Sequence, residues 1–169
     1  MRVSTLLLAC FARQKCKKMT LEEELKNSKP IAPNARAVLN IIFTASWLDC
    51  LMSRSMRPYG LTNPQYNILR ILKGSYPGGL SVLDIKSRML DRSSNVSRLV
   101  EKLREHGLAE RTPSADDRRM VVVNITEKGL ELLEHIGVDI FDNQGQYPGG
   151  KMTEAELVQL GLLLDKIRE

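Results

Sequence analysis

Apolar residues recur every three or four positions along most of the chain, which is the spacing of one face of an α-helix. The predicted helices cover residues 35–57, 63–73, 82–89, 94–106, 127–141 and a final segment after Thr153. A short first helix is expected after Thr20. Three helix starts have the capping-box pattern, a hydroxyl residue followed three positions later by Gln, Asp or Glu. These are Thr62–Gln65, Ser81–Asp84 and Thr153–Glu156.

The hydrophobic pattern changes to that of β-strands between residues 108 and 125. Leu108–Arg111 predicts a short strand, and Met120–Ile125 is a β-branched run in which alternate residues share one face. Residues 112–119 are polar and fit the tip of a hairpin that joins the two strands. Gly, Pro and polar residues predict a loop over residues 142–152.

This order of elements predicts a mainly α fold with a small β-hairpin wing, a winged helix-turn-helix. In such a fold the second helix of the pair, here residues 94–106, enters the DNA major groove. The hairpin beside it reaches the flanking backbone or the minor groove. Residues 61–126 are therefore predicted to form a DNA-binding domain.

Asp91-Arg92-Ser93 predicts a turn and the cap of the 94–106 helix. Polar residues gather at the start of this helix, where the backbone amides and the helix dipole also favour anions. The candidate DNA-binding residues are Ser93, Ser94, Asn95, Ser97, Arg98 and Lys102. Their side chains are of the types that bind phosphates and base edges. The solvated face of any amphipathic helix gives a similar pattern, so this helix alone leaves both interpretations open.

The predicted hairpin tip carries Arg118 and Arg119. Arginine suits insertion into a narrow, electronegative minor groove. Asp116 or Asp117 would hold the tip or an arginine in register through a charge-assisted hydrogen bond. Arginines at this position favour DNA binding over the alternative, a winged-helix module that binds only proteins.

The charge distribution separates the chain into regions. Its 169 residues carry 25 basic and 20 acidic side chains, a net charge of +5. Residues 1–18 hold five of the basic residues and no acid, and we expect an extension there or a true start at Met19. Residues 54–119 contain thirteen basic and seven acidic side chains, whereas residues 120–169 contain four and nine. The basic middle suits contact with a polyanion, and the acidic end suggests another task.

Three segments together resemble the MarR family of bacterial transcription regulators. The most specific runs from Asp116 to Gly129, with Asp-x-Arg, a strand and then Thr-x-x-Gly. Leu61-Thr62, Gln65-Tyr66 and Leu69 resemble the opening of the family's second helix, and Gly107–Arg111 resembles its entry into the wing. The resemblance covers about residues 35–135. It weakens after residue 138, because family members commonly have a long helix where this chain has the loop over 142–152.

The resemblance implies a homodimeric regulator, expected to be a repressor, that binds a pseudo-palindromic operator in double-stranded DNA. It assigns the minor-groove contact to Arg118 and its support to Asp116. It places an N-terminal extension at residues 1–33 and dimerisation helices at residues 34–60 and 127–169. Family members often respond to small aromatic ligands. Residues of this chain that could line a ligand crevice, or equally form ordinary core and interface, are Trp47, Met52, Met56, Tyr59 and Tyr66.

Other function classes have little support in the sequence. It contains no phosphate-binding loop, paired carboxylates or nucleophile elbow, and its two histidines and three cysteines lack metal-ligand spacing. We therefore predict no enzyme activity, catalytic residue, cofactor or metal. No run of 18 uninterrupted apolar residues occurs, which predicts a cytoplasmic protein without a membrane-spanning helix. Cys50 lies in an apolar helical run and is expected in the core.

Overall fold

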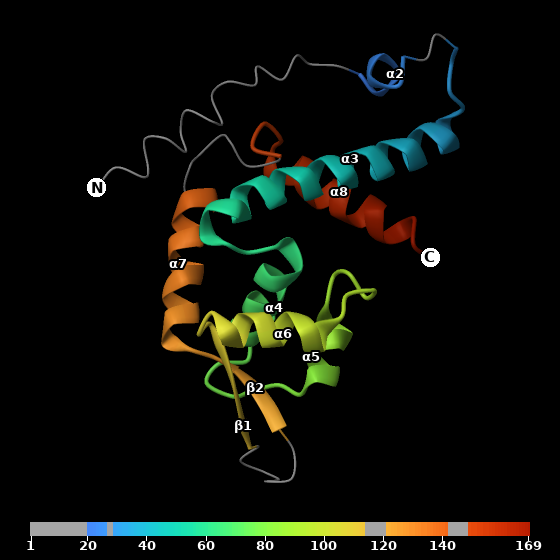
Figure 1. The fold of residues 1–169 in the computed structure, drawn as a ribbon. Helices are drawn as coiled ribbons and strands as arrows, with labels where there is room; N and C mark the ends of the chain where they lie inside the picture. The colour runs from blue at the N-terminus through green and yellow to red at the C-terminus, as the bar shows by residue number, and fades with distance from the viewer. Residues whose placement is uncertain (1–19, 27–28, 114–120, 142–148) are drawn as a thin grey trace. The chain divides into compact units, whose positions relative to one another are not determined.

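The computed structural model describes residues 20–26, 29–113, 121–141 and 149–169 (Figure 1). The chain divides into two compact units, residues 1–47 and 48–169. The first unit holds α2 (Leu21–Glu24) and most of α3 (Pro33–Met56). The short helix predicted after Thr20 is present, and Thr20 caps it in a capping box with Glu23. Arg36 of α3 pairs with Glu22 of α2 at 2.6 Å, which lowers the pKa of that carboxyl.

Helix α3 confirms the helix predicted over 35–57. It ends in a single 3-10 turn, η1 (Arg57–Tyr59), followed by Gly60 in the left-handed conformation at φ 68°. Large apolar side chains between its start and Trp47 are exposed, including Val38, Ile42 and Trp47 itself. Cys50 is also exposed, so its predicted core position is wrong. Apolar spacing predicted the helix correctly, but part of its apolar surface is exposed among the described residues.

The expectation that no helix could span a membrane was also too strong. The helical stretch Pro33–Tyr59 is long and apolar enough to cross one by length and composition. The sequence prediction considered only uninterrupted apolar runs. Isolated polar residues such as Asn40 and Thr44 interrupt this stretch but lower its mean hydropathy only slightly. A core or interface helix of a soluble protein passes the same test.

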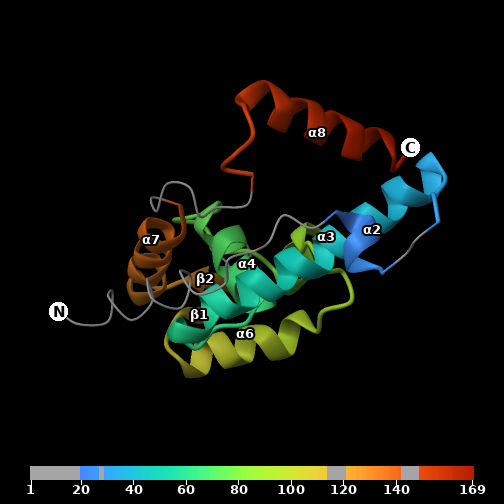
Figure 2. The same cartoon turned by 90° about the horizontal axis from the view of Figure 1, so that it is seen from above.

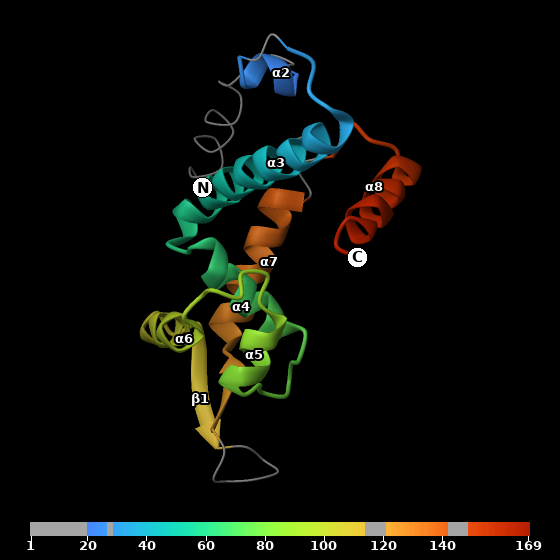
Figure 3. The ribbon, with the colours of Figure 1, turned by 90° about the vertical axis from the view of Figure 1, so that its right-hand side faces the viewer.

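The second unit contains the winged helix-turn-helix that the sequence predicts (Figures 1 and 3). Its helices are α4 (Asn63–Lys73), α5 (Val82–Arg88) and α6 (Val96–Glu105). The wing strands are β1 (Ala109–Pro113) and β2 (Val121–Ile125), and α7 (Glu127–Phe141) follows them. Helix α8 (Glu154–Lys166) comes last. The predicted caps Thr62, Ser81 and Thr153 are all present at the starts of α4, α5 and α8.

One hydrophobic core holds the winged helix-turn-helix together. Its fully buried side chains come from α3, α4, α5, α6, β2 and α7: Met56, Ile68, Leu69, Ile85, Val100, Leu103, Val123 and Ile136. Helix α7 contacts α4, a packing also seen from above in Figure 2. Asn63 at the start of α4 donates hydrogen bonds to the Asp49 carboxylate at 2.7 Å and to Ser53 Oγ at 3.0 Å. These contacts fix the end of α3 against α4.

The wing is a two-stranded antiparallel sheet with an added bridge. Ala109 pairs with Ile125 and Pro113 pairs with Val121, so the predicted antiparallel strands are confirmed. Thr112 and Pro113, which were predicted in the hairpin tip, belong to β1 because they continue its pairing with β2. Leu80, in the turn before α5, exchanges two backbone hydrogen bonds with Val123 at 2.8 and 3.0 Å. A β-carbon on Gly79 would collide with the Asn124 side chain, so only glycine lets this turn approach β2 closely.

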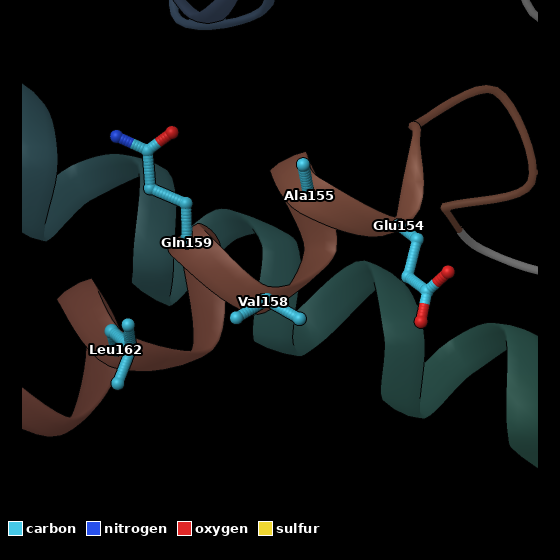
Figure 4. Close-up of a pocket in the computed structure, with 5 residues that line it drawn as sticks. All are labelled: Glu154, Ala155, Val158, Gln159 and Leu162. Atoms are coloured by element: carbon cyan, nitrogen blue, oxygen red, sulfur yellow. The ribbon is translucent and has the colours of Figure 1, made fainter.

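Helix α8 begins at its predicted cap, but its apolar residues are not buried. Leu164 is partly buried, and every other residue of α8 is exposed. Figure 4 shows a shallow surface depression lined entirely by α8 residues: Glu154, Ala155, Val158, Gln159 and Leu162. Three of the five are apolar, so this surface is poorly suited to remain in water.

Candidate nucleic-acid interface

Helix α6 is held by its apolar side and presents its polar side to solvent. Val96, Val100 and Leu103 are buried in the core, where α6 contacts α4, α5 and β1. Ser97, Arg98 and Lys102 lie away from these residues and are exposed. The structure thus brings three of the six predicted major-groove residues together on the outward side of α6.

The start of α6 differs from the sequence prediction. The cap is Asn95, whose side-chain oxygen accepts a hydrogen bond from the Arg98 amide at 3.2 Å, and not Ser93. Ser93 and Ser94 instead donate their hydroxyls to the Asp91 carboxylate at 2.6 and 2.8 Å. Helix α6 begins at Val96, two residues later than the predicted start at residue 94, so Asn95 occupies the cap position.

The Asp91 contacts determine what the two serines can offer a ligand. The hydrogen bond from Ser93 lowers the pKa of Asp91 the most, and the hydrogen bond from Ser94 lowers it further, so the carboxylate stays ionised. Each serine hydrogen is already donated, and the hydroxyl oxygens remain available as acceptors. Sequence reasoning read Asp91 only as part of a turn. Asp91 precedes Ser93 by two residues and Ser94 by three, and this spacing is the sequence signal that could have revealed the cluster.

A second charged group on α6 was also missed. Glu101 accepts a forked hydrogen bond from Arg104, with the shortest contact at 2.6 Å between Nη2 and Oε1. This pairing lowers the pKa of Glu101 and raises that of Arg104. The i,i+3 spacing of opposite charges on a predicted helix could have identified the pair.

The wing strands are in place, but the wing tip is not described. Asp116, Arg118 and Arg119 lie outside the described residues, so their roles stay predictions. At the strand ends leading to the tip, the Asn124 amide donates to Thr112 Oγ1 at 2.7 Å across the hairpin. This cross-strand bond fixes the register from which the tip extends.

The Thr-x-x-Gly segment joins the end of α6 to the start of α7. Thr126 Oγ1 accepts from the Gly129 amide at 3.2 Å and donates to the Gly107 carbonyl at 2.7 Å. Lys128 donates to the His106 carbonyl at 2.8 Å. A β-carbon at Gly129 would collide with the Leu108 carbonyl oxygen. The motif is therefore a structural joint that fixes the wing relative to α6.

The residues predicted for a ligand crevice occupy different surroundings. Met56 and Tyr66 are buried in the core, and Met52 and Tyr59 pack against it. Trp47 belongs to the other unit and is 45% exposed. Four of the five thus have the core packing that was the alternative interpretation, and the crevice stays a prediction. Among the described ranges, no three His, Cys, Asp or Glu side chains are grouped to hold a metal ion.

Comparison with known proteins identifies the family. A sequence-family model described as MarR family matches residues 59–120. The HTH-type transcriptional repressor MdtR of Bacillus subtilis is 33% identical over 118 residues, which cover 70% of this chain and 74% of MdtR.

Two solved structures share the fold at 22% identity and a TM-score of 0.67 each. CouR from Rhodococcus jostii RHA1, bound to p-coumaroyl-CoA, covers 82% of this chain and 95% of its own. The MepR–DNA complex from S. aureus covers 80% and 96%. The sequence matches and the shared fold agree: this chain belongs to the MarR family of winged helix-turn-helix, DNA-binding transcriptional regulators.

Proposed function

We propose that this protein is a cytoplasmic, homodimeric repressor that binds a pseudo-palindromic operator in double-stranded DNA. The observation that carries the proposal is the outward side of α6, where Arg98 and Lys102 are exposed on a helix anchored by buried Val96, Val100 and Leu103. The repressor name of MdtR and the DNA in the MepR complex support it.

The proposed DNA contacts divide between the groove-entering helix and the wing. From the start of α6, the Ser93 and Ser94 hydroxyl oxygens would accept from base amino groups, and Asn95 and Ser97 would contact base edges and phosphates. Arg98 and Lys102 would neutralise phosphates. Arg118 and Arg119, with Asp116 in support, would enter the minor groove. Two protomers would then read half-sites about one helical turn apart.

The proposed dimer rests on apolar surface that a single chain leaves open. On α3, Val38, Ile42, Phe43 and Trp47 are exposed, and on α8 so are Leu157, Leu160 and Leu163. Several exposed apolar side chains on one helix mark interaction sites in soluble proteins. We assign these helices, within residues 34–60 and 127–169, to contact with a second copy, and residues 61–126 to DNA.

Ligand control is the finer part of the proposal. The p-coumaroyl-CoA bound to CouR supports a small aromatic ligand for this chain as well. Trp47, Met52, Met56, Tyr59 and Tyr66 are the candidate contacts. Because Met56 and Tyr66 are buried, a ligand that reaches them must favour a conformation in which they are exposed. Such a differential affinity is what release from the operator requires.

Binding to duplexes selected from host genomic fragments tests the proposal, with affinity measured by fluorescence anisotropy over a range of salt. Arg118→Ala should weaken binding at least about tenfold, as loss of a minor-groove arginine would. Lys102→Ala should weaken binding to all sequences and reduce the salt slope by about 0.9. Lys151→Ala, at an exposed position outside the winged helix, is the control. If Arg118→Ala and Lys102→Ala both bind DNA with wild-type affinity, the assignment of these two residues to DNA contact is wrong.

A further inference from the structure

Glu101 is an acidic residue on the side of α6 that faces away from the core. A helical advance of about 100° per residue puts positions 98, 101, 102 and 105 opposite the buried Val96, Val100 and Leu103. The Glu101 side chain is 41% exposed. A carboxylate on this side would repel the DNA backbone unless its charge is compensated or it meets a hydrogen-bond donor.

Arg104 supplies the compensation. Its Nε lies 3.1 Å from Oε1 and 3.3 Å from Oε2 of Glu101, and its Nη2 lies 2.6 Å from Oε1. Arg111 of β1 adds a weaker attraction from the wing. The carboxylate therefore stays ionised, is held in one orientation, and can approach a phosphate-lined groove at low electrostatic cost.

The geometry leaves acceptor capacity on Glu101 unused. A carboxylate has about four lone-pair sites and can only accept hydrogen bonds. Arg104 directs two of its contacts to Oε1 and a single longer one to Oε2. In the major groove, the donors are the exocyclic amino groups of cytosine and adenine, and Glu suits cytosine N4.

We propose that Glu101 is a specificity-determining residue that accepts a hydrogen bond from cytosine N4 in each half-site, with Arg104 as its positioning residue. The inference rests on the proposed DNA-binding function and adds a base preference to it. The alternative is an ordinary i,i+3 surface ion pair, which would affect helix stability and leave base preference unchanged.

Selection from a random duplex library, followed by affinity measurement, tests this inference. Wild type should select cytosine at one position per half-site, and replacing that C·G pair should weaken binding about tenfold. Glu101→Ala should lose this discrimination. Glu101→Gln should move the preference toward adenine, because Gln pairs with adenine N6 and N7. Glu105→Gln makes the same change of charge on the same side of α6 and should select the wild-type sequence.

The outcomes separate this inference from the function on which it rests. If Glu101→Ala and Glu101→Gln select the same bases as wild type, the cytosine contact is wrong while DNA binding stands. If wild type itself enriches no duplex and shows no salt-dependent affinity, the proposed function fails. Glu101→Gln is nearly isosteric, so a folding defect in Glu101→Ala would leave the test decisive.

Discussion

The winged-helix core and α8 have the same kind of sequence pattern but opposite burial. Leu69 in α4 and Leu103 in α6 are completely buried, whereas Leu157, Leu160 and Leu163 in α8 are 43–56% exposed. Helical spacing of apolar residues therefore predicts the helix in both regions, but it does not say which surface covers the apolar side. In the winged helix the cover comes from the same chain. For α8 we propose that it comes from a second copy.

The largest expected effect lies in the core. Leu103→Ala removes a completely buried side chain and should lower the free energy of unfolding by about 2–5 kcal/mol, measured by urea denaturation. Leu83→Ala, at a position 78% exposed on α5, should change it by less than about 0.5 kcal/mol. Equal effects of the two substitutions would contradict the assignment of the core.

The next effect concerns α8 and the proposed dimer. Leu160→Asp places a charge among the exposed apolar residues and should raise the dimer dissociation constant by tenfold or more, because each buried leucine contributes about 1.5–3 kcal/mol. Sedimentation equilibrium measures the change. Leu83→Asp makes the same substitution on α5, at a position that is 78% exposed and outside the proposed dimer contact, and is the matched control. A wild-type protein that is monomeric at all concentrations would remove the basis for this prediction.

The joint between the wing and α7 offers a pair of glycines for comparison. Gly129→Ala would push a β-carbon against the Leu108 carbonyl and should destabilise the protein by about 1–3 kcal/mol. Gly137→Ala, in the middle of α7 with open space around it, should stabilise by about 0.5–1 kcal/mol. Thermal unfolding of both variants checks the prediction. A Gly129→Ala variant that is as stable as wild type, or more stable, would show that the joint is not close-packed.

The smallest expected effect is a pH-dependent change in stability at the start of α6, caused by Asp91. The serine hydroxyls hold the pKa of Asp91 below its usual range. A pKa lowered by folding contributes stability above the unfolded-state pKa, and this is lost as pH falls through the folded-state value. The Ser93 amide resonance should therefore shift in acid, below the usual pKa of Asp. The shift should be absent in Asp91→Asn, and its persistence there would assign it to another group.

Local chemistry explains how far the sequence predicted the fold. The caps Thr62, Ser81 and Thr153 were predictable because each needs only a side chain and an amide three residues on. The same rule misplaced the cap of α6, because the helix begins at Val96 and not at residue 94, which makes Asn95 the cap. Ser93 Oγ donates to the Asp91 carboxylate instead, a contact that the capping rule does not consider.

Features that depend on distant or external surfaces were beyond the sequence pattern. The bridge between Leu80 and Val123 joins segments more than forty residues apart, and no local signal marks it. The exposed Cys50 was misjudged because apolar neighbours indicate burial only when something covers them. Within the candidate interface, Arg98 and Lys102 could be chosen from helical spacing, whereas the Glu101–Arg104 ion pair was overlooked although its i,i+3 spacing is present in the sequence.

The central claim is that α6 carries the contact with DNA while α8 does not. The most direct measurement is the salt dependence of affinity for a selected duplex, in wild type, in Arg98→Ala/Lys102→Ala and in Lys151→Ala/Lys166→Ala. The first double variant should bind more weakly and lose about 1.8 from the slope of log affinity against log salt, about 0.9 for each phosphate contact. The second should match wild type. Equal slopes in all three proteins would contradict the assignment of α6 as the DNA-contacting helix.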